Sequence, residues 1–178
     1  RALQAWDHVQ RLAPCSRAIL RKVLLRDNGI DARHFALDSM EEAFTVTPDA
    51  MSARFAKHAP ALAAAAAMNA LRSGGVDSAS IDGVIVSTCT GYLCPGLTSY
   101  VSESLGLRAA AVALDLVGQG CGAALPNLRA GEALIASGQC QRVLSICVEV
   151  CSAAVYLDDD PGVLISACLF GDGAGAAV

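Results

Sequence analysis

A cysteine set among glycines is the residue of this sequence best placed for chemistry. Cys121 lies in the tract Gly-Gln-Gly-Cys-Gly at residues 118–122, which follows the apolar run 111–116 and precedes the small-residue segment 123–137. The run predicts a buried strand and the segment a helix, so Cys121 would lie at a helix amino terminus. Free amide groups and the helix dipole stabilise a thiolate there. We therefore predict that Cys121 is a catalytic nucleophile; the alternative is a buried structural cysteine.

The elements around Cys121 alternate between strand and helix patterns. Strand patterns cover residues 82–88, 112–116 and 142–148, and helix patterns cover residues 95–105 and 123–137. This order predicts an α/β fold with a mainly parallel sheet flanked by helices, and functional groups are then expected at the carboxyl ends of the strands.

The amino-terminal third predicts three further elements. Residues 3–25 have helical spacing, and residues 34–37 resemble a short strand. Thr47 and Pro48 open a helix that runs through residues 59–71, with a kink or a new start at Pro60. Further along, the acidic residues 158–162 predict an exposed turn, because they lack the alternating ligands of a calcium loop.

Charge and hydropathy narrow the function classes. The chain has 178 residues and a net charge of −4, which argues against nucleic-acid binding because no basic excess is available for phosphates. The apolar stretch 84–102 contains glycines, a proline and hydroxyls, so we interpret it as core rather than as a membrane span. The charged amino-terminal residues do not resemble a signal peptide, and a cytoplasmic location follows as the default.

Cysteine usage favours free thiols. The eight cysteines lack the spacing of a disulfide scaffold, and no CxxC pair accompanies the three histidines, so no metal site is expected. The chain begins without methionine and stops inside an apolar run where a strand is expected to continue. Residues 1–178 are therefore expected to form a single domain of a longer protein.

Four motifs together resemble the chalcone and stilbene synthase-like enzymes, the type III polyketide synthases. They are Val-Ser-Thr-Cys-Thr-Gly-Tyr-Leu-Cys-Pro-Gly at 86–96, the Cys121 turn, Cys-Val-Glu at 147–149 and Leu-Phe-Gly-Asp-Gly-Ala at 169–174. The resemblance spans about residues 29–178. It implies a thiolase-like fold of two similar halves, of which this chain resembles only the amino-terminal one; the carboxy-terminal half is expected to be absent from this chain.

The resemblance implies a decarboxylative Claisen condensation on coenzyme A thioesters. Cys121 matches the family cysteine that accepts a starter acyl group from acyl-CoA, and malonyl-CoA then supplies two carbons as an enolate. A histidine and an asparagine from the carboxy-terminal half would stabilise the enolate oxygen. A homodimer is implied, and no cofactor is expected beyond the coenzyme A carried by the substrates.

The resemblance also assigns binding residues. Phe170 matches a phenylalanine between the coenzyme A tunnel and the cavity; a core aromatic beside a glycine turn is the other interpretation. Cys89 and Ala154 match threonines that line the cavity of plant chalcone synthases, and Cys94 matches a methionine that reaches across the dimer. These departures imply a roomier, more apolar cavity. The predicted substrate-binding set is Cys89, Thr90, Cys94, Cys151, Ala154 and Phe170.

A basic cluster near the amino terminus has two interpretations. Arg17, Arg21, Lys22 and Arg26 correspond to basic residues that meet coenzyme A phosphates in the family, and they also suit a solvated helix face. Two rival functions remain open: a ketoacyl-acyl carrier protein synthase-like condensing enzyme, and a non-catalytic assembly half-domain.

Overall fold

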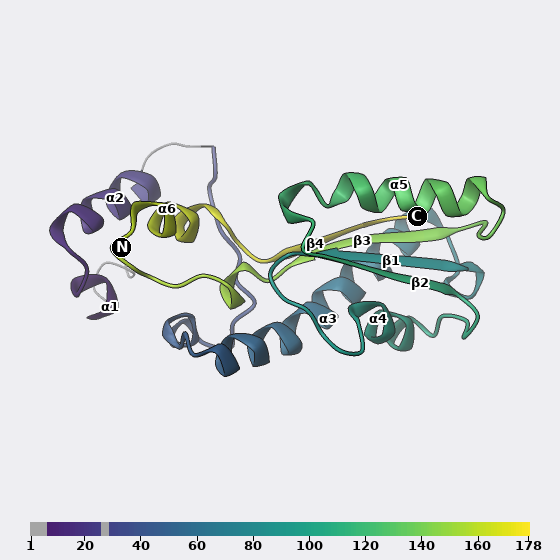
Figure 1. Cartoon of the computed structure of the whole chain (residues 1–178), viewed down its shortest axis with the longest axis horizontal. Coiled ribbons are helices and arrows are strands. Elements are labelled where there is room, and N and C mark those ends of the chain that lie inside the picture. Colours follow the sequence, from purple (N-terminus) through teal and green to yellow (C-terminus); the bar gives the residue numbers. More distant parts are fainter. Residues whose placement is uncertain (1–6, 26–28) are drawn as a thin grey trace.

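The computed structural model describes residues 7–25 and 29–178, and the strands of this part form one mixed sheet (Figure 1). The strand order is β2-β1-β3-β4, with β1 at Gly83–Thr88, β2 at Val112–Val117, β3 at Val143–Glu149 and β4 at Gly173–Ala177. Strand β1 pairs in parallel with both β2 and β3, whereas β4 runs antiparallel to β3. The mainly parallel sheet expected from the sequence is therefore confirmed.

Helices cover both faces of this sheet. Helix α5 (Ala124–Ala136) lies on one face, and α3 (Pro48–Gly74) and α4 (Leu97–Leu105) lie on the other (Figure 1). Helices α2 (Pro14–Leu25) and α6 (Pro161–Leu169) lie together at one end of the molecule, beyond the carboxyl ends of the parallel strands, and the short α1 (Asp7–Gln10) lies near them. The described 3-10 turns are η2 (Met40–Phe44), η3 (Ser78–Ser80), η4 (Gly120–Gly122) and η5 (Cys151–Ala153).

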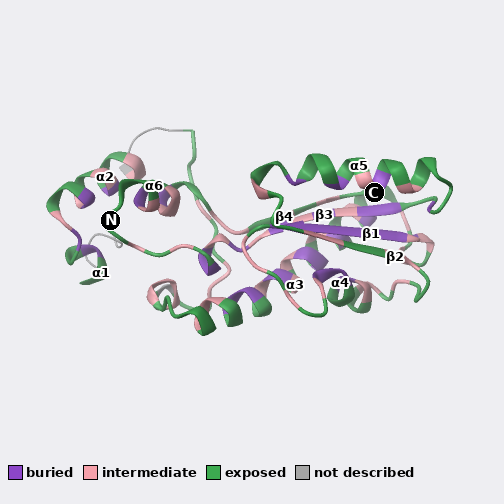
Figure 2. Ribbon diagram, viewed as in Figure 1, coloured by how far each residue is buried: buried purple, intermediate pink, exposed green. Residues whose placement is uncertain are grey.

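The core is built around β1, of which all six residues are buried (Figure 2). Val84 and Val86 pack toward α3, where Ala59, Ala63 and Ala67 let the helix approach the sheet closely. Ile85 points to the other face and packs with residues of α5 and β3. This alternation follows from the two-residue period of a strand. No helix of the described part of the chain has the length and apolar character needed to cross a membrane.

One local prediction was wrong, and two others held only in part. The expected helix over 3–25 is broken into α1 and α2, because Pro14 has no amide hydrogen and starts a new helix; residues 3–6 lie outside the described residues. Helix α3 is continuous through Pro60, so no new helix starts there. Residues 158–160 are exposed and lie outside the helices, as expected, but Pro161 and Gly162 open α6, since the Asp160 carboxylate accepts from the amides of Gly162 and Val163 at 2.8 and 3.0 Å.

The strand expected at residues 34–37 is also wrong. The segment is not assigned as a strand, and a side chain takes the place of a neighbouring strand. The Asp172 amide donates to the His34 carbonyl oxygen at 2.7 Å, and the Ala36 amide donates to the Asp172 carboxylate at 2.7 Å. One aspartate therefore satisfies backbone groups that a sheet partner would otherwise bind.

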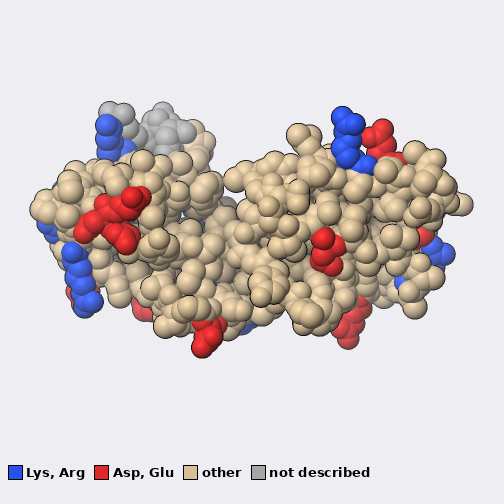
Figure 3. All heavy atoms as spheres, in the orientation of Figure 1, with Lys and Arg blue, Asp and Glu red and all other residues tan. Residues whose placement is uncertain are grey.

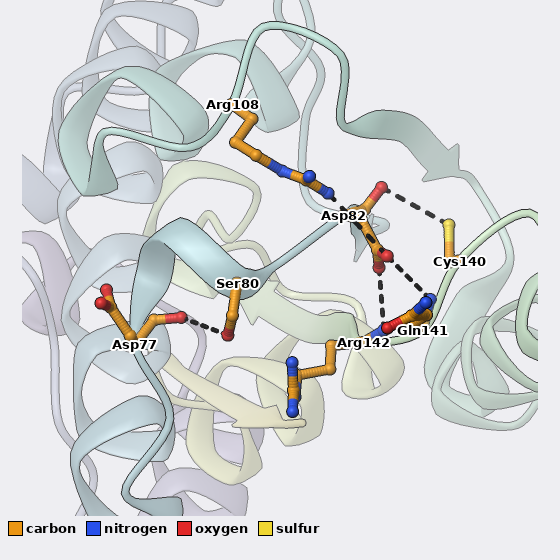
Figure 4. Close-up of polar contacts among 7 residues, drawn as sticks. All are labelled: Asp77, Ser80, Asp82, Arg108, Cys140, Gln141 and Arg142. Carbon is orange, nitrogen blue, oxygen red and sulfur yellow. Dashed lines mark hydrogen bonds and ion pairs between the residues drawn. The ribbon is translucent and has the colours of Figure 1, made fainter.

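Asp82 organises the amino-terminal end of the sheet (Figure 4). Its carboxylate accepts from the amides of Gln141 and Arg142 at 2.8 Å each, and Arg108 lies 3.9 Å away. Burial by itself would raise the pKa of Asp82, but these amides and the Arg108 charge outweigh it and hold the pKa below the ordinary 3.8. The carboxylate thus ties the start of β1 to the turn before β3.

We predict that Asp82→Asn destabilises the fold at neutral pH by about 1–2 kcal/mol, since an amide oxygen replaces a charged acceptor. A carboxyl whose pKa is depressed by folding contributes stability above its unfolded value near 3.8, and this contribution is lost as the pH falls through the folded value. Urea unfolding at a series of pH values should show the difference from wild type shrinking in acid. Asp77→Asn is the control, because Asn caps η3 equally well; a difference for Asp82→Asn that does not vary with pH would contradict the assignment.

Candidate active site

Cys121 lies in the turn η4 between the end of β2 and the start of α5. Gly118 and Gly120 adopt φ values of +76° and +69°, which side chains with a Cβ rarely adopt. The Gly118 amide donates to the Thr88 carbonyl oxygen at 3.0 Å, so the turn is attached to the end of β1. The strand, turn and helix expected from the sequence are present, but the prediction that this strand is buried is wrong, because β2 is an edge strand whose residues are exposed or half-buried. Cys121 is exposed rather than buried.

The carboxyl ends of the three parallel strands bring the predicted cysteines together. Cys89 follows β1, Cys121 follows β2 and Cys151 follows β3. A charge on Cys121 is a lesser cause of the raised pKa values of Cys89 and Cys151, so the three sulfurs lie within electrostatic range of one another. Cys89 and Cys151 lie 62 positions apart in the chain. Together with Cys121 they form one cluster at one edge of the sheet.

Glu149 holds the ends of β1 and β3 together at this edge of the sheet. Its carboxylate accepts from the Cys89 amide at 2.9 Å, from the Thr90 amide at 3.0 Å and from the Thr90 hydroxyl at 2.8 Å. The Val150 amide donates to the same Thr90 hydroxyl at 2.9 Å. Thr90 was predicted to bind substrate, and here its hydroxyl is engaged in holding the end of β1 against the end of β3.

The neighbouring thiols are held in their neutral form. Although Cys89 is exposed as a residue, partial burial of its thiol, followed by the hydrogen bond and charge of Glu149, raises its pKa to about 11. Burial, followed by the charges of Asp172 and Glu149, raises the pKa of Cys151 to about 11. Both groups therefore present neutral, polarisable surfaces beside Cys121. In residues 7–25 and 29–178, no group of three or more His, Cys, Asp or Glu could hold a metal ion.

The other predicted binding residues, Cys94, Ala154 and Phe170, are all exposed. Ala154 is exposed at the end of η5, and Cys94 is exposed and precedes Pro95 through a cis peptide bond. Phe170 lies between α6 and β4 and is 45% exposed, so the interpretation as a core aromatic is wrong for this chain.

The basic cluster lies apart from Cys89, Cys121 and Cys151. Arg17, Arg21 and Lys22 lie on α2, at the end of the molecule away from the sheet, while Arg26 is outside the described residues (Figure 1).

Sequence reasoning missed two side chains that position η5. The buried Arg54 guanidinium donates to the carbonyl oxygens of Ser152, Glu42 and Thr45, the last at 3.2 Å. Asp172 accepts from the Ser152 amide at 2.8 Å and from its hydroxyl at 2.6 Å. A signal for Arg54 was present, since it is a charged residue beside Phe55 on the inner face of a long helix. Asp172 lies in the Leu-Phe-Gly-Asp-Gly-Ala motif, but the sequence indicated no hydrogen-bond partner for it.

Asn127 fixes the helix that follows Cys121. It is fully buried, and its amide nitrogen donates to the Ser87 hydroxyl at 3.1 Å and to the Ile146 carbonyl oxygen at 2.9 Å. The Ser145 hydroxyl donates to its amide oxygen at 2.7 Å. These contacts join α5 to β1 and β3, and they set the direction in which the Cys121 turn leaves the sheet.

We predict that Glu149→Gln lowers the pKa of Cys89 from about 11 part of the way toward the ordinary 9.0, because burial remains but the hydrogen bond to a charged group is lost. Iodoacetamide labelling of Cys89 as a function of pH, followed by peptide mass spectrometry, measures this change. The exposed Cys15 serves as the internal reference for reagent activity. An unchanged labelling profile at Cys89 would rule out Glu149 as a cause.

Comparisons with known proteins identify the family of this chain. Residues 15–178 match the family model for chalcone and stilbene synthases, N-terminal domain. The chain is 30% identical over 178 residues to phloroglucinol synthase of Pseudomonas fluorescens, covering 98% of this chain and 51% of that protein.

Two solved structures extend the comparison. The C-terminal type III polyketide synthase domain of Steely1 from Dictyostelium superposes with a TM-score of 0.79 at 27% identity, covering 91% of this chain and 45% of that one. CsyB complexed with CoA-SH gives 0.78 at 25% identity, with coverages of 96% and 50%. The chain thus spans about half the length of the relatives it matches. It belongs to the chalcone and stilbene synthase family of type III polyketide synthases and corresponds to the amino-terminal domain of that family.

Proposed function

We propose that this chain is the nucleophile-bearing half of a type III polyketide synthase that condenses malonyl-CoA with a starter acyl group held on Cys121. The observation that carries the proposal is the exposed Cys121 thiol at the junction of β2 and α5, in a chain that matches this family over residues 15–178. The glycine turn at the end of β2 presents the thiol without covering it, which acyl transfer requires.

The reaction divides into two steps. The Cys121 thiolate attacks the carbonyl carbon of an acyl-CoA, and the carbon–sulfur bond to coenzyme A breaks as the new thioester forms. Malonyl-CoA then loses carbon dioxide, and the enolate attacks the thioester carbon, which releases Cys121 and lengthens the chain by two carbons. A thiolate suits both steps because it is a good nucleophile and a competent leaving group.

A second half-domain is part of the proposal, since the enolate needs fixed hydrogen-bond donors. The outward face of α5 supports it. Leu125, Leu128 and Ile135 are 71%, 53% and 49% exposed, and their spacing places them on one side of the helix (Figure 2). Apolar side chains grouped in this way typically mark a contact surface. We propose that the carboxy-terminal half covers this face and supplies the histidine and asparagine.

A homodimer is also proposed, with β2 in its interface. This strand forms one edge of the described sheet, and Leu114 and Val117 on it are 37% and 45% exposed. On the face shown in Figure 3, most atoms over the sheet belong to uncharged residues. A long unpaired edge with exposed apolar side chains favours pairing with a second copy, since the same surface can serve both partners.

Acyl-CoA and malonyl-CoA are the proposed substrates, and Arg17, Arg21 and Lys22 on α2 are proposed to contact coenzyme A phosphates. A solved relative, CsyB, is described in complex with CoA-SH, which supports this choice. A cytoplasmic location is proposed as well. It suits the eight cysteines, all of them free, because thiols stay reduced there.

We predict that Cys121→Ala abolishes acylation and lowers kcat/KM at least about 10³-fold in the full-length protein. Peptide mass spectrometry after exposure to acyl-CoA, with and without malonyl-CoA, locates the adduct. Cys15→Ala, which removes an exposed thiol on α2, should leave the adduct at Cys121. If the folded protein forms no adduct, a non-catalytic assembly domain becomes the better description.

We predict that Leu114→Lys converts the dimer to monomer without unfolding it, because a charge then lies at the proposed interface. Sedimentation velocity of the full-length protein measures the oligomeric state, and circular dichroism checks the fold. Met68→Lys is the matched control, since Met68 is 44% exposed on α3, away from β2. A dimer that persists in Leu114→Lys would place the interface elsewhere.

A further inference from the structure

Helix α2, which bears the described part of the basic cluster, packs chiefly against α6. Leu20 of α2 joins Leu164 and Cys168 of α6 in a small apolar cluster that is separate from the core around the sheet. The two helices lie side by side at the end of the molecule (Figure 1). Apolar packing is not directional, so it holds the helices together without fixing how far one slides or turns along the other.

A hydrogen bond at the start of α2 supplies this missing direction. The Asp159 carboxylate accepts from the Ala13 amide at 2.8 Å, although the two residues lie 146 positions apart in the chain. The Ala13 carbonyl oxygen in turn accepts from the Arg17 amide at 3.0 Å, which closes a helical turn. Asp159 therefore holds the residue from which α2 starts, and Arg17 lies in the turn that follows.

Asp159 makes this bond as a carboxylate. Ser16 is buried, and its hydroxyl makes no hydrogen bond of ordinary geometry within the described part of the chain. The Ser16 side chain nevertheless lies near enough to hold the pKa of Asp159 below the ordinary 3.8, together with the Ala13 amide. At neutral pH the acceptor is therefore ionised, and hydrogen bonds to a charged acceptor are stronger than those between neutral groups.

The next residue, Asp160, holds the second helix at the same place. Its carboxylate accepts from the amides of Gly162 and Val163 at 2.8 and 3.0 Å and so caps the start of α6. Two adjacent aspartates thus fix the beginnings of α2 and α6 against each other. From this common point α2 carries the basic cluster, and α6 leads to Phe170.

We propose that Asp159 is a positioning residue for coenzyme A, because it fixes the start of α2 and thereby places the basic cluster against the coenzyme A phosphates. The inference rests on the proposed function. Arg21 and Lys22 are exposed on α2, so the seating of the helix decides where their charges lie. Asp159 acts only through the helix, since a carboxylate and a phosphate repel each other.

The sign of the effect separates positioning from simple electrostatics. Coenzyme A is an anion, so removal of a nearby negative charge would by itself strengthen its binding. Loss of an anchor weakens binding instead, because a helix that is less firmly seated must be ordered when the ligand binds. The two effects oppose each other in Asp159→Ala, and weaker binding is the result that positioning requires.

The test measures the Kd of coenzyme A for the full-length protein by isothermal titration calorimetry. We expect Asp159→Ala to raise Kd about fivefold, since a hydrogen bond to a charged acceptor is lost. Asp159→Asn should raise it less, because an amide oxygen can still accept from Ala13. Asp158→Ala is the matched control and should not raise Kd: it removes the same charge one residue earlier, where the carboxylate binds the local Asp160 amide at 3.3 Å.

A second readout tests whether the chemistry at Cys121 is intact. S-acetyl-N-acetylcysteamine has the reacting thioester of acetyl-CoA but none of its phosphates. Its rate of Cys121 acylation, followed by mass spectrometry, should be the same in wild type and Asp159→Ala. The rate with acetyl-CoA below saturation should fall about fivefold in the variant, in line with Kd. A general structural defect would slow both reactions.

The outcomes separate this inference from the proposed function. If wild type binds no coenzyme A, or if neither thioester acylates Cys121, the proposed function is wrong. If wild type binds coenzyme A and Asp159→Ala binds it equally or more tightly, Asp159 does not position the helix for this ligand. Equal slowing with both thioesters would overturn the inference too. If Asp159→Ala does not fold, the comparison of Asp159→Asn with wild type decides in the same way.

Discussion

The parallel pairing of β1 with both β2 and β3 is the constraint on which the candidate site depends. Parallel neighbours end at the same edge of a sheet, so the residues that follow these strands are brought together however far apart they lie in the chain. The central strand is buried along its whole length, which fixes its register. Cys89, Cys121 and Cys151 meet for this reason, and Glu149 then holds the first and third strand ends together.

Beyond the sheet, polar side chains take over from regular secondary structure. Asp172, Arg54 and Glu149 bind backbone groups of segments that have no strand or helix partner. A buried polar group is costly unless it is hydrogen-bonded, and each of these side chains is hydrogen-bonded to backbone groups of another segment. Hydrogen bonds from these side chains therefore fix the irregular segments near the site where strand pairing does not.

The sequence predicted the elements whose pattern is local. Strands with buried runs, the helix of small residues after Cys121 and the glycine turn between them all follow from spacing within a short window. The errors have two kinds of cause: the helix starts at Pro14 and Pro161 follow from local residues, whereas the segment 34–37 and the role of Arg54 depend on distant ones. Residues 34–37 have the local pattern of a strand, but the Ala36 amide donates to Asp172, which lies 136 positions away in the chain. The role of Arg54 could not be predicted either, since its acceptors are backbone carbonyls that carry no mark in the sequence.

The hydrogen bonds from Asp172 and Arg54 to the main chain have an evolutionary consequence. Because Asp172 and Arg54 bind the main chain of Ser152, Ala36 and Glu42, the scaffold makes no demand on the side chains of Phe35, Val155 or Tyr156. Those positions can mutate while the loops that carry them keep their course. A few side-chain anchors would then let this backbone carry different side chains at these positions without rebuilding the fold.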